Sequence, residues 1–191
     1  MKKLILALAL GVVILFGASL CLNGLAAKNA QKEHLWLMQT ILPGSESFTL
    51  EPYAGDDANI RSVHKAENGF VIETVTRGYA DDIRMLVGVS KEGRVTGLVV
   101  ADAYETLGLG SRILTDHVFL SQFLNGTGAF AAATADAFSG ATGEAETGEE
   151  TQVDAISGAT VSSKAVIRCV NSAIAYVTGA DVFSGATSWG G

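Results

Sequence analysis

The sequence predicts an α+β fold: a twisted, mainly antiparallel sheet packed with helices, preceded by one N-terminal transmembrane helix. Three observations predict it. Residues 4–22 form an apolar, uncharged run that is long enough to cross a bilayer as a helix. Between residues 60 and 101, β-rich segments alternate with turn signals, which is typical of an antiparallel meander. Residues 162–178 carry apolar side chains at helical spacing, which predicts a helix against the sheet.

The composition limits the class of protein. The 191 residues suit one domain with an appendage. The formal net charge of -7 argues against a nucleic-acid partner, which needs a cationic surface. Cys21 lies in the apolar run and Cys169 in the predicted helix, so no internal disulfide is expected. No Cys or His cluster has metal-ligand spacing, so no metal site is expected either.

The first 27 residues are predicted to be a single-pass membrane anchor. The apolar run is longer than the roughly 7–15 residues usual in a cleaved signal, although a cleaved signal peptide stays the alternative. Lysines lie on both sides of the run, so their count does not fix its orientation. Residues 28–45 are predicted to be a connecting helix, which Pro43-Gly44 ends.

Residues 46–180 are predicted to be the folded domain. Asn68-Gly69 is a strong hairpin turn between two β-rich segments, and residues 91–94 form a second turn between residues 83–90 and 95–101. A short helix is expected over residues 118–124.

Two segments are predicted to be flexible from their composition. Residues 126–152 are rich in Ala, Gly, Thr and Glu, so we expect an acidic insertion there. Residues 181–191 are expected to form a flexible C-terminal tail.

A loop of small residues precedes the last helix. Ser162 or Ser163 is the expected N-cap of that helix and Gly179 its stop. Thr160 would then lie just ahead of a helix N-terminus, where free N–H groups favour a phosphate. Gly158 and Ala159 would let a bulky group approach the backbone closely.

This loop carries a recognisable pattern. Its sequence, Asp-Ala-Ile-Ser-Gly-Ala-Thr-Val-Ser over residues 154–162, resembles the flavinylation motif of the FMN-binding domain family. That family includes the G subunit of the Rnf electron-transport complex and the C subunit of the sodium-pumping NADH:quinone reductase. The resemblance implies that Thr160 holds FMN through a phosphodiester bond. An ordinary capped loop ahead of an amphipathic helix is the alternative.

A second stretch, Glu-Thr-Leu-Gly-Leu-Gly over residues 105–110, resembles the family's Glu-Thr-Pro-Gly-Leu-Gly loop and departs from it at Leu107. In the family this loop lies beside the flavin; a plain strand-to-helix loop is the alternative. The resemblance implies covalent FMN on Thr160 and no catalytic or metal-binding residue. The implied cofactor-binding residues besides Thr160 are Asp154, Ser157, Gly158, Ala159, Ser162, Ser163, Lys164, Glu105, Thr106, Leu107, Gly108, Leu109 and Gly110.

The resemblance implies a function in electron transfer. The expected protein is a cell-membrane subunit with its domain on the extracytoplasmic side, carrying electrons within an Rnf-type ion-translocating complex rather than acting as an enzyme alone. Its expected partners are the other subunits of the complex, the membrane, and a flavin transferase that uses FAD and magnesium. The alternatives are a stand-alone flavinylated domain of another respiratory or extracellular electron-transfer chain, and a flavin-free surface interaction module.

The Asp-x-x-Ser-Gly-Ala-Thr pattern occurs three times. The further copies are Asp136 to Thr142 and Asp181 to Thr187. Further flavin sites are the alternative, but we expect both to be mostly decoys, because only Thr160 is followed by a hydroxyl two residues on and by a predicted helix. Thr142 precedes an acidic run that would repel a phosphate.

Overall fold

The computed structural model describes residues 31–103, 116–133 and 150–180. The chain divides into two compact units, Met1–Leu37 and Met38–Gly191. Residues 31–41 are helical and a turn at Pro43-Gly44 follows, as the sequence predicts. The compact domain therefore begins at Met38, inside the helix that we predicted as a connector. Among the described residues no helix is long and apolar enough to cross a membrane, and the predicted anchor lies outside them.

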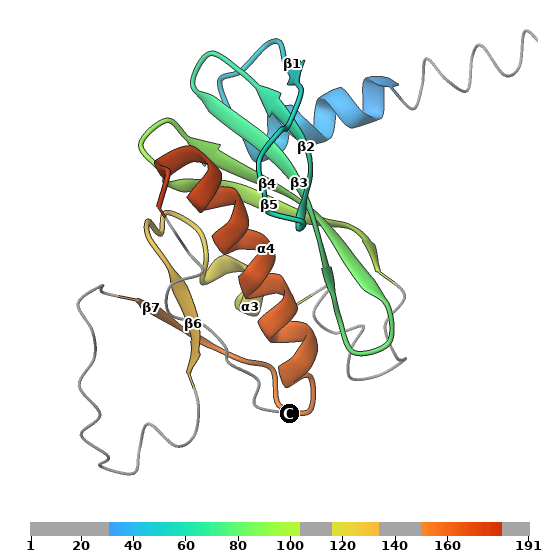
Figure 1. Ribbon diagram of the computed structural model, residues 1–191, viewed down its shortest axis with the longest axis vertical. Helices are drawn as coiled ribbons and strands as arrows, with labels where there is room; N and C mark the ends of the chain where they lie inside the picture. The colour runs from blue at the N-terminus through green and yellow to red at the C-terminus, as the bar shows by residue number, and fades with distance from the viewer. Residues whose placement is uncertain (1–30, 104–115, 134–149, 181–191) are drawn as a thin grey trace, which may run out of the picture. The chain divides into compact units, whose positions relative to one another are not determined.

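The main sheet is an antiparallel meander of five strands in the order β1-β2-β3-β4-β5 (Figure 1). Every neighbouring pair in it is antiparallel, which confirms the predicted α+β class. Both predicted hairpins are present, and the short first strand is an addition that the sequence analysis missed. The strands are β1 (Thr49–Glu51), β2 (Ile60–Lys65), β3 (Gly69–Arg77), β4 (Asp82–Ser90) and β5 (Val95–Ala103).

A separate two-stranded sheet lies beside the meander and corrects one prediction. β6 (Phe130–Ala133) and β7 (Thr151–Asp154) pair in parallel, with Phe130 opposite Thr151. Both ends of the predicted flexible insertion, residues 126–152, are therefore ordered, while residues 134–149 lie outside the described part. Composition failed here because Phe130 and Val153 are buried, at 3% and 0% exposure, and hold two strands of otherwise small or polar residues in the core.

Among the described residues, two helices follow the meander. α3 (His117–Ser121) is shorter than the predicted 118–124, and Asp116 caps it by accepting from the N–H groups of Val118 and Phe119. α4 (Thr160–Thr178) ends at Gly179, whose left-handed backbone (φ 69°) makes it the expected stop. The sequence thus predicts the second helix accurately at its C-terminal end.

The sheet is covered on both faces. α4 crosses β3 and β4 on one face (Figure 1), where Val166, Val170 and Ile174 enter a core that includes Ile72 of β3. The next residue back along the strand, Val71, points the other way and packs with Ile41 and Leu42. Successive residues of β3 thus point into hydrophobic cores on opposite faces of the sheet, as expected for a β-strand. This packing holds α4 rigidly against the sheet.

Candidate functional site

Thr160 is the first residue of α4 and is exposed to solvent. The N-cap is Ala159, at φ -126° and ψ 30°, and no side chain caps the helix. Our expectation that Ser162 or Ser163 would be the N-cap is therefore wrong, because the observed cap lies three residues before Ser162. An α-helix leaves its first N–H groups without intrahelical partners, and its first turn here contains no acidic residue. These N–H groups can therefore receive an anion bound at Thr160.

The loop ahead of Thr160 is folded back onto the helix. Gly158 has φ 79°, a left-handed conformation that glycine adopts without strain. The N–H of Ala159 donates to the carbonyl of Ile156 at 2.9 Å, and the N–H of Ile156 donates to Ser163 Oγ at 3.1 Å. Ser163 holds this loop from inside the first turn, which is why it does not act as the cap. The loop before Thr160 is thus fixed by the helix that follows it.

The predicted motif residues divide into two groups by exposure. Around Thr160 the exposed ones are Asp154, Ser157, Gly158 and Lys164. Ala159 is 5% exposed, and Ser162 and Ser163 are 0% exposed. The surface that a ligand can reach is therefore formed by the exposed group. The two serines contribute to the interior and can meet a ligand only through their backbone.

The N-terminal half of α4 is fastened to one end of the main sheet. Thr76 Oγ1 donates to the carbonyl of Ala165 at 2.8 Å, and Arg168 Nη2 donates to the carbonyl of Arg77 at 3.3 Å. The Cys169 thiol is fully buried beside Thr76. Burial raises the pKa of this thiol, and the nearby Thr74 and Thr76 hydroxyls and the Arg168 charge oppose the rise only in part. Thr160 is thereby held near the C-terminal end of β3.

The second predicted loop, Glu105 to Gly110, lies outside the described residues. The chain leaves β5 for that loop at Ala103, which pairs with Ile83 of β4. The Ile83 carbonyl is also the acceptor for a weak contact from the Cys169 thiol of α4, at 3.9 Å. The last described residue before that loop therefore lies at the end of the sheet where α4 begins.

One functional candidate was missed by the sequence analysis. The side-chain amide of Gln122, which follows α3, pairs with the backbone of Asp154. The Asp154 N–H donates to Gln122 Oε1 at 2.8 Å, and Gln122 Nε2 donates to the Asp154 carbonyl at 3.3 Å. No local pattern marks this glutamine, because its partner lies 32 residues away and the bond is made to backbone. Only the tertiary structure identifies it.

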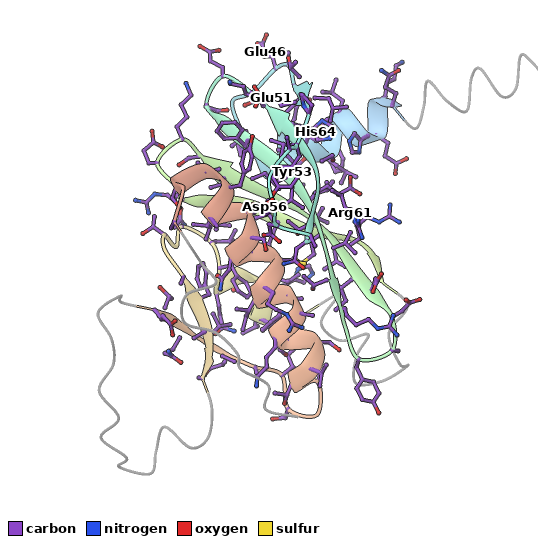
Figure 2. All side chains as sticks on the ribbon, in the orientation of Figure 1. Glu46, Glu51, Tyr53, Asp56, Arg61 and His64 are labelled. Carbon is purple, nitrogen blue, oxygen red and sulfur yellow. The ribbon has the colours of Figure 1, made fainter. Side chains whose placement is uncertain are left out.

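Titratable side chains elsewhere gather around β1 and β2. Figure 2 labels Glu46, Glu51, Tyr53, Asp56, Arg61 and His64, which come from these strands and the segments beside them. Glu51 forms an ion pair with Lys65 at 2.9 Å, with exposed fractions of 33% and 53% for the two side chains. A pair this exposed contributes little stability and suggests a solvated surface. Within the described ranges no three His, Cys, Asp or Glu side chains are grouped to hold a metal ion.

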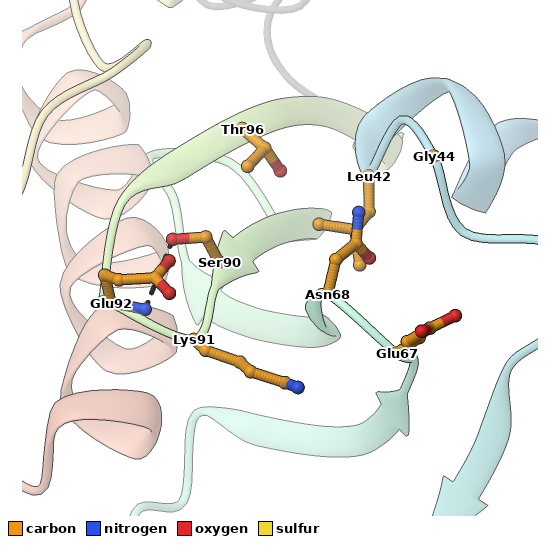
Figure 3. Close-up of a pocket in the computed structure, with 8 residues that line it drawn as sticks. All are labelled: Leu42, Gly44, Glu67, Asn68, Ser90, Lys91, Glu92 and Thr96. Atoms are coloured by element: carbon orange, nitrogen blue, oxygen red, sulfur yellow. Dashed lines mark hydrogen bonds between the residues drawn. The ribbon is translucent and has the colours of Figure 1, made fainter.

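An open hollow of about 680 Å³ lies at the other end of the sheet. Figure 3 shows its lining, which comes from the two hairpin turns and the segment after residue 41: Leu42, Gly44, Glu67, Asn68, Ser90, Lys91, Glu92 and Thr96. These turns lie at the Gly69 end of β3, whereas α4 begins near its Arg77 end. The hollow is mixed in charge and open to solvent, and it is separate from the Thr160 site.

Comparison with known proteins gives the same assignment as the motif. The profile of the FMN-binding domain matches residues 78–175, which include Thr160. The G subunit of the ion-translocating oxidoreductase complex of Methanosarcina acetivorans is 35% identical over 153 residues, covering 74% of this chain and 73% of the relative. The G subunit of the Na(+)-translocating ferredoxin:NAD(+) oxidoreductase complex of Acetobacterium woodii is 35% identical over 107 residues, covering 56% of this chain and 47% of that relative.

The fold has a solved counterpart. The crystal structure of the C subunit of the Na(+)-translocating NADH-quinone reductase from Parabacteroides distasonis matches with a TM-score of 0.53 and 19% identity, covering 80% of this chain and 95% of that chain. At this identity the likeness supports the fold alone. Since the family profile covers about half of the chain and the Methanosarcina relative nearly three quarters of it, the chain belongs to the FMN-binding domain family.

Proposed function

We propose that this protein is a membrane-anchored, extracytoplasmic electron carrier of an Rnf-type ion-translocating complex, with FMN attached covalently to Thr160. The observation that carries the proposal is the exposure of Thr160 at the uncapped start of α4, inside the matched family region. The relatives are named as subunits of ion-translocating complexes, which supports membrane redox partners for this chain.

The residues around Thr160 fit a phosphate ester. The first-turn N–H groups and the helix field favour an anion, and no acidic side chain opposes it in that turn. Lys164 is exposed and lies four residues after Thr160, so both belong to the same face of the helix. Its ammonium group is placed to neutralise part of the phosphate charge, which screening at an exposed site limits to a modest effect.

The attachment requires a second protein. A flavin transferase presents FAD, and the Thr160 hydroxyl oxygen attacks the phosphorus on the flavin side of the pyrophosphate. The new phosphorus–oxygen bond replaces the one to AMP, which leaves, while the hydroxyl proton passes to a base of the transferase. This chain supplies an exposed hydroxyl at the first residue of α4, directly after a fixed loop, and the exposed carboxylate of Asp154 helps to present that loop to the transferase.

Covalent attachment suits the proposed location. Occupancy of a reversible site depends on the free ligand concentration relative to Kd. Outside the membrane a site without a flavin pool would empty, and a phosphodiester removes that dependence. Bound FMN supplies one- and two-electron transfer. The described part of the chain supplies a rigid support for the attachment point, since α4 is packed against two strands of the sheet.

Intact mass spectrometry of the exported chain tests the attachment. Co-expressed with a flavin transferase, the wild type is expected to gain one FMN, and Thr160→Ala is expected to gain none. Thr178→Ala, which removes a hydroxyl at the far end of the same helix, is the matched control and keeps the FMN. A full FMN mass on Thr160→Ala excludes this residue as the acceptor. An unmodified wild type, with the transferase active on a known substrate, favours the flavin-free interaction module instead.

The choice of complex is tested separately from the attachment. Flavinylated chain captured from native membranes is expected to co-purify with other subunits of an ion-translocating redox complex. Recovery of the flavinylated chain alone, under conditions that keep such a complex intact, favours the stand-alone carrier of another electron-transfer chain.

A further inference from the structure

Two side-chain amides border the small parallel sheet of β6 and β7, each making the hydrogen bonds that a neighbouring strand would make. Gln122 pairs with the N–H and carbonyl of Asp154, at 2.8 and 3.3 Å. Asn171 pairs with the carbonyl and N–H of Phe130, at 2.9 and 3.0 Å. Asp154 is the last residue of β7 and Phe130 the first of β6. The two amides thus hold opposite corners of one sheet.

Gln122 is anchored in the core by its neighbours. Phe119 and Phe123 flank it in sequence, are 2% and 0% exposed, and meet edge to face at 5.5 Å between ring centroids. Phe123 also meets Phe130 at 5.1 Å. The backbone that carries the Gln122 amide is therefore fixed to the same core as the sheet. A strand end held by this amide is fixed to that core as well.

The corner held by Gln122 is the start of the loop that carries the attachment site. One residue, Ala155, separates Asp154 from Ile156, whose N–H is held by Ser163. The chain from Asp154 to Thr160 is thus fixed by Gln122 at its entry and by Ser163 in its middle. Asn171, in contrast, holds Phe130, which is distant in sequence from the loop and on the other strand.

We infer that Gln122 is a positioning residue for the FMN on Thr160: its amide fixes the backbone of Asp154, and so fixes where the loop presents Thr160 and the flavin attached there. This inference rests on the proposed function. It adds a residue that lies outside the flavin motif and 38 positions before Thr160 in sequence. Asn171, which lies on α4 eleven residues after Thr160, makes its equivalent pair with Phe130 of β6 rather than with this loop.

The test compares near-isosteric variants of the two amides in the full-length chain purified in detergent. Gln122→Met and Asn171→Leu each keep most of the side-chain volume and remove both hydrogen bonds to the strand backbone; Gln122→Met also removes a long bond to the Phe119 carbonyl, at 3.5 Å. Gln122→Glu keeps the acceptor for the Asp154 N–H and removes only the donor, so it is the conservative variant for rescue. For each chain, the rate of FMN uptake at limiting transferase, the fluorescence anisotropy and visible circular dichroism of the bound flavin, and the melting temperature are measured.

Gln122→Met and Asn171→Leu should differ in their effects on the attached flavin. Gln122→Met should slow FMN uptake or increase the mobile fraction of bound flavin by about five-fold, the size expected for losing a pair of hydrogen bonds. Asn171→Leu should leave both flavin readouts at the wild-type level whatever its melting temperature, and Gln122→Glu should fall between wild type and Gln122→Met. If Gln122→Met matches the wild type in both flavin readouts, or if flavin readouts track the melting temperature equally in both variants, Gln122 has only a structural role. A wild-type chain without FMN on Thr160 would instead refute the proposed function.

Discussion

The hydroxyl of Ser163 accepts a hydrogen bond from the N–H of Ile156 at 3.1 Å, which ties the first turn of α4 to the loop that precedes it. Ser163 is 0% exposed, so this bond is made in the interior. One buried side chain thus joins the helix start to the loop before it. The position of Thr160, between these two residues, therefore depends on the helix as much as on the loop.

Replacing Ser163 by Ala should destabilise the domain by about 1–3 kcal/mol, because the Ile156 N–H would stay half-buried without its partner. Ser157→Ala is the control, since Ser157 belongs to the same loop and is exposed. Its effect should stay within about 0.5 kcal/mol. Urea unfolding measures both changes. Equal losses for the two serines would show that the Ser163 bond contributes nothing specific.

Two neighbouring threonines of β3 provide a second comparison. Thr76 Oγ1 donates to the Ala165 carbonyl of α4 at 2.8 Å, whereas the buried Thr74 hydroxyl has no partner of normal hydrogen-bond geometry among the described residues and only adjoins the Cys169 thiol. Thr76→Val should cost about 1–2 kcal/mol, and Thr74→Val should be neutral or stabilising. Thermal or urea unfolding distinguishes them. A larger loss for Thr74→Val would contradict this description of the interface.

The buried Cys169 thiol makes stability depend on alkaline pH. Burial raises its pKa in the folded state, so past about pH 8.5 the unfolded chain loses a thiol proton that the folded chain keeps. The unfolded state then binds fewer protons, and the free energy of unfolding falls as pH rises; below that pH the contribution is fully present. Cys169→Ala should flatten this fall between about pH 8 and 10, whatever its effect at neutral pH. Unfolding curves of both chains at several pH values test this, and parallel slopes would contradict it.

The elements that the sequence predicts well are those whose signals are local. The Asn68-Gly69 turn, the residue 91–94 turn and the Gly179 helix stop each depend on a few adjacent residues, and all three are present. The sequence predicts the N-cap of α4 three or four residues too late, at Ser162 or Ser163 instead of Ala159. The Ser163 hydroxyl instead accepts a hydrogen bond from the Ile156 N–H, a contact that the local sequence does not predict.

The parts that could not be predicted depend on contacts between distant segments. β6 and β7 pair across a gap of 17 residues, and their order comes from buried Phe130 and Val153 rather than from β-propensity. Gln122 and Asn171 hold backbone groups 32 and 41 residues away. The flavin motif itself can be recognised in the sequence. The Gln122 amide that holds the first residue of the motif, Asp154, can be identified only from the tertiary structure.

The membrane anchor is tested by location. The uninterrupted apolar run Leu4 to Leu22 predicts that the mature chain stays in washed membranes with its N-terminus intact. Added protease should digest the domain in intact cells if the domain is extracytoplasmic. A released soluble form that begins near Ala27 or Ala30 would show that the run is a cleaved signal peptide.

The chain contains three copies of the Asp-x-x-Ser-Gly-Ala-Thr pattern, so the threonine that receives FMN must be identified among three candidates. Ser163, three residues after Thr160, holds the loop in place. The equivalent positions after Thr142 and Thr187 are Ala145 and Gly190, which have no hydroxyl. Neither other copy therefore carries a hydroxyl at the position that fixes the Thr160 loop, and we expect flavin only on Thr160.

Peptide mapping of the exported, co-expressed chain tests this central claim most directly. Flavin fluorescence and mass are followed through the peptides that hold Thr142, Thr160 and Thr187. We predict one FMN per chain, on the peptide with Thr160. Stoichiometric FMN on the Thr142 or Thr187 peptide, or a chain without covalent flavin beside an active transferase, would contradict it.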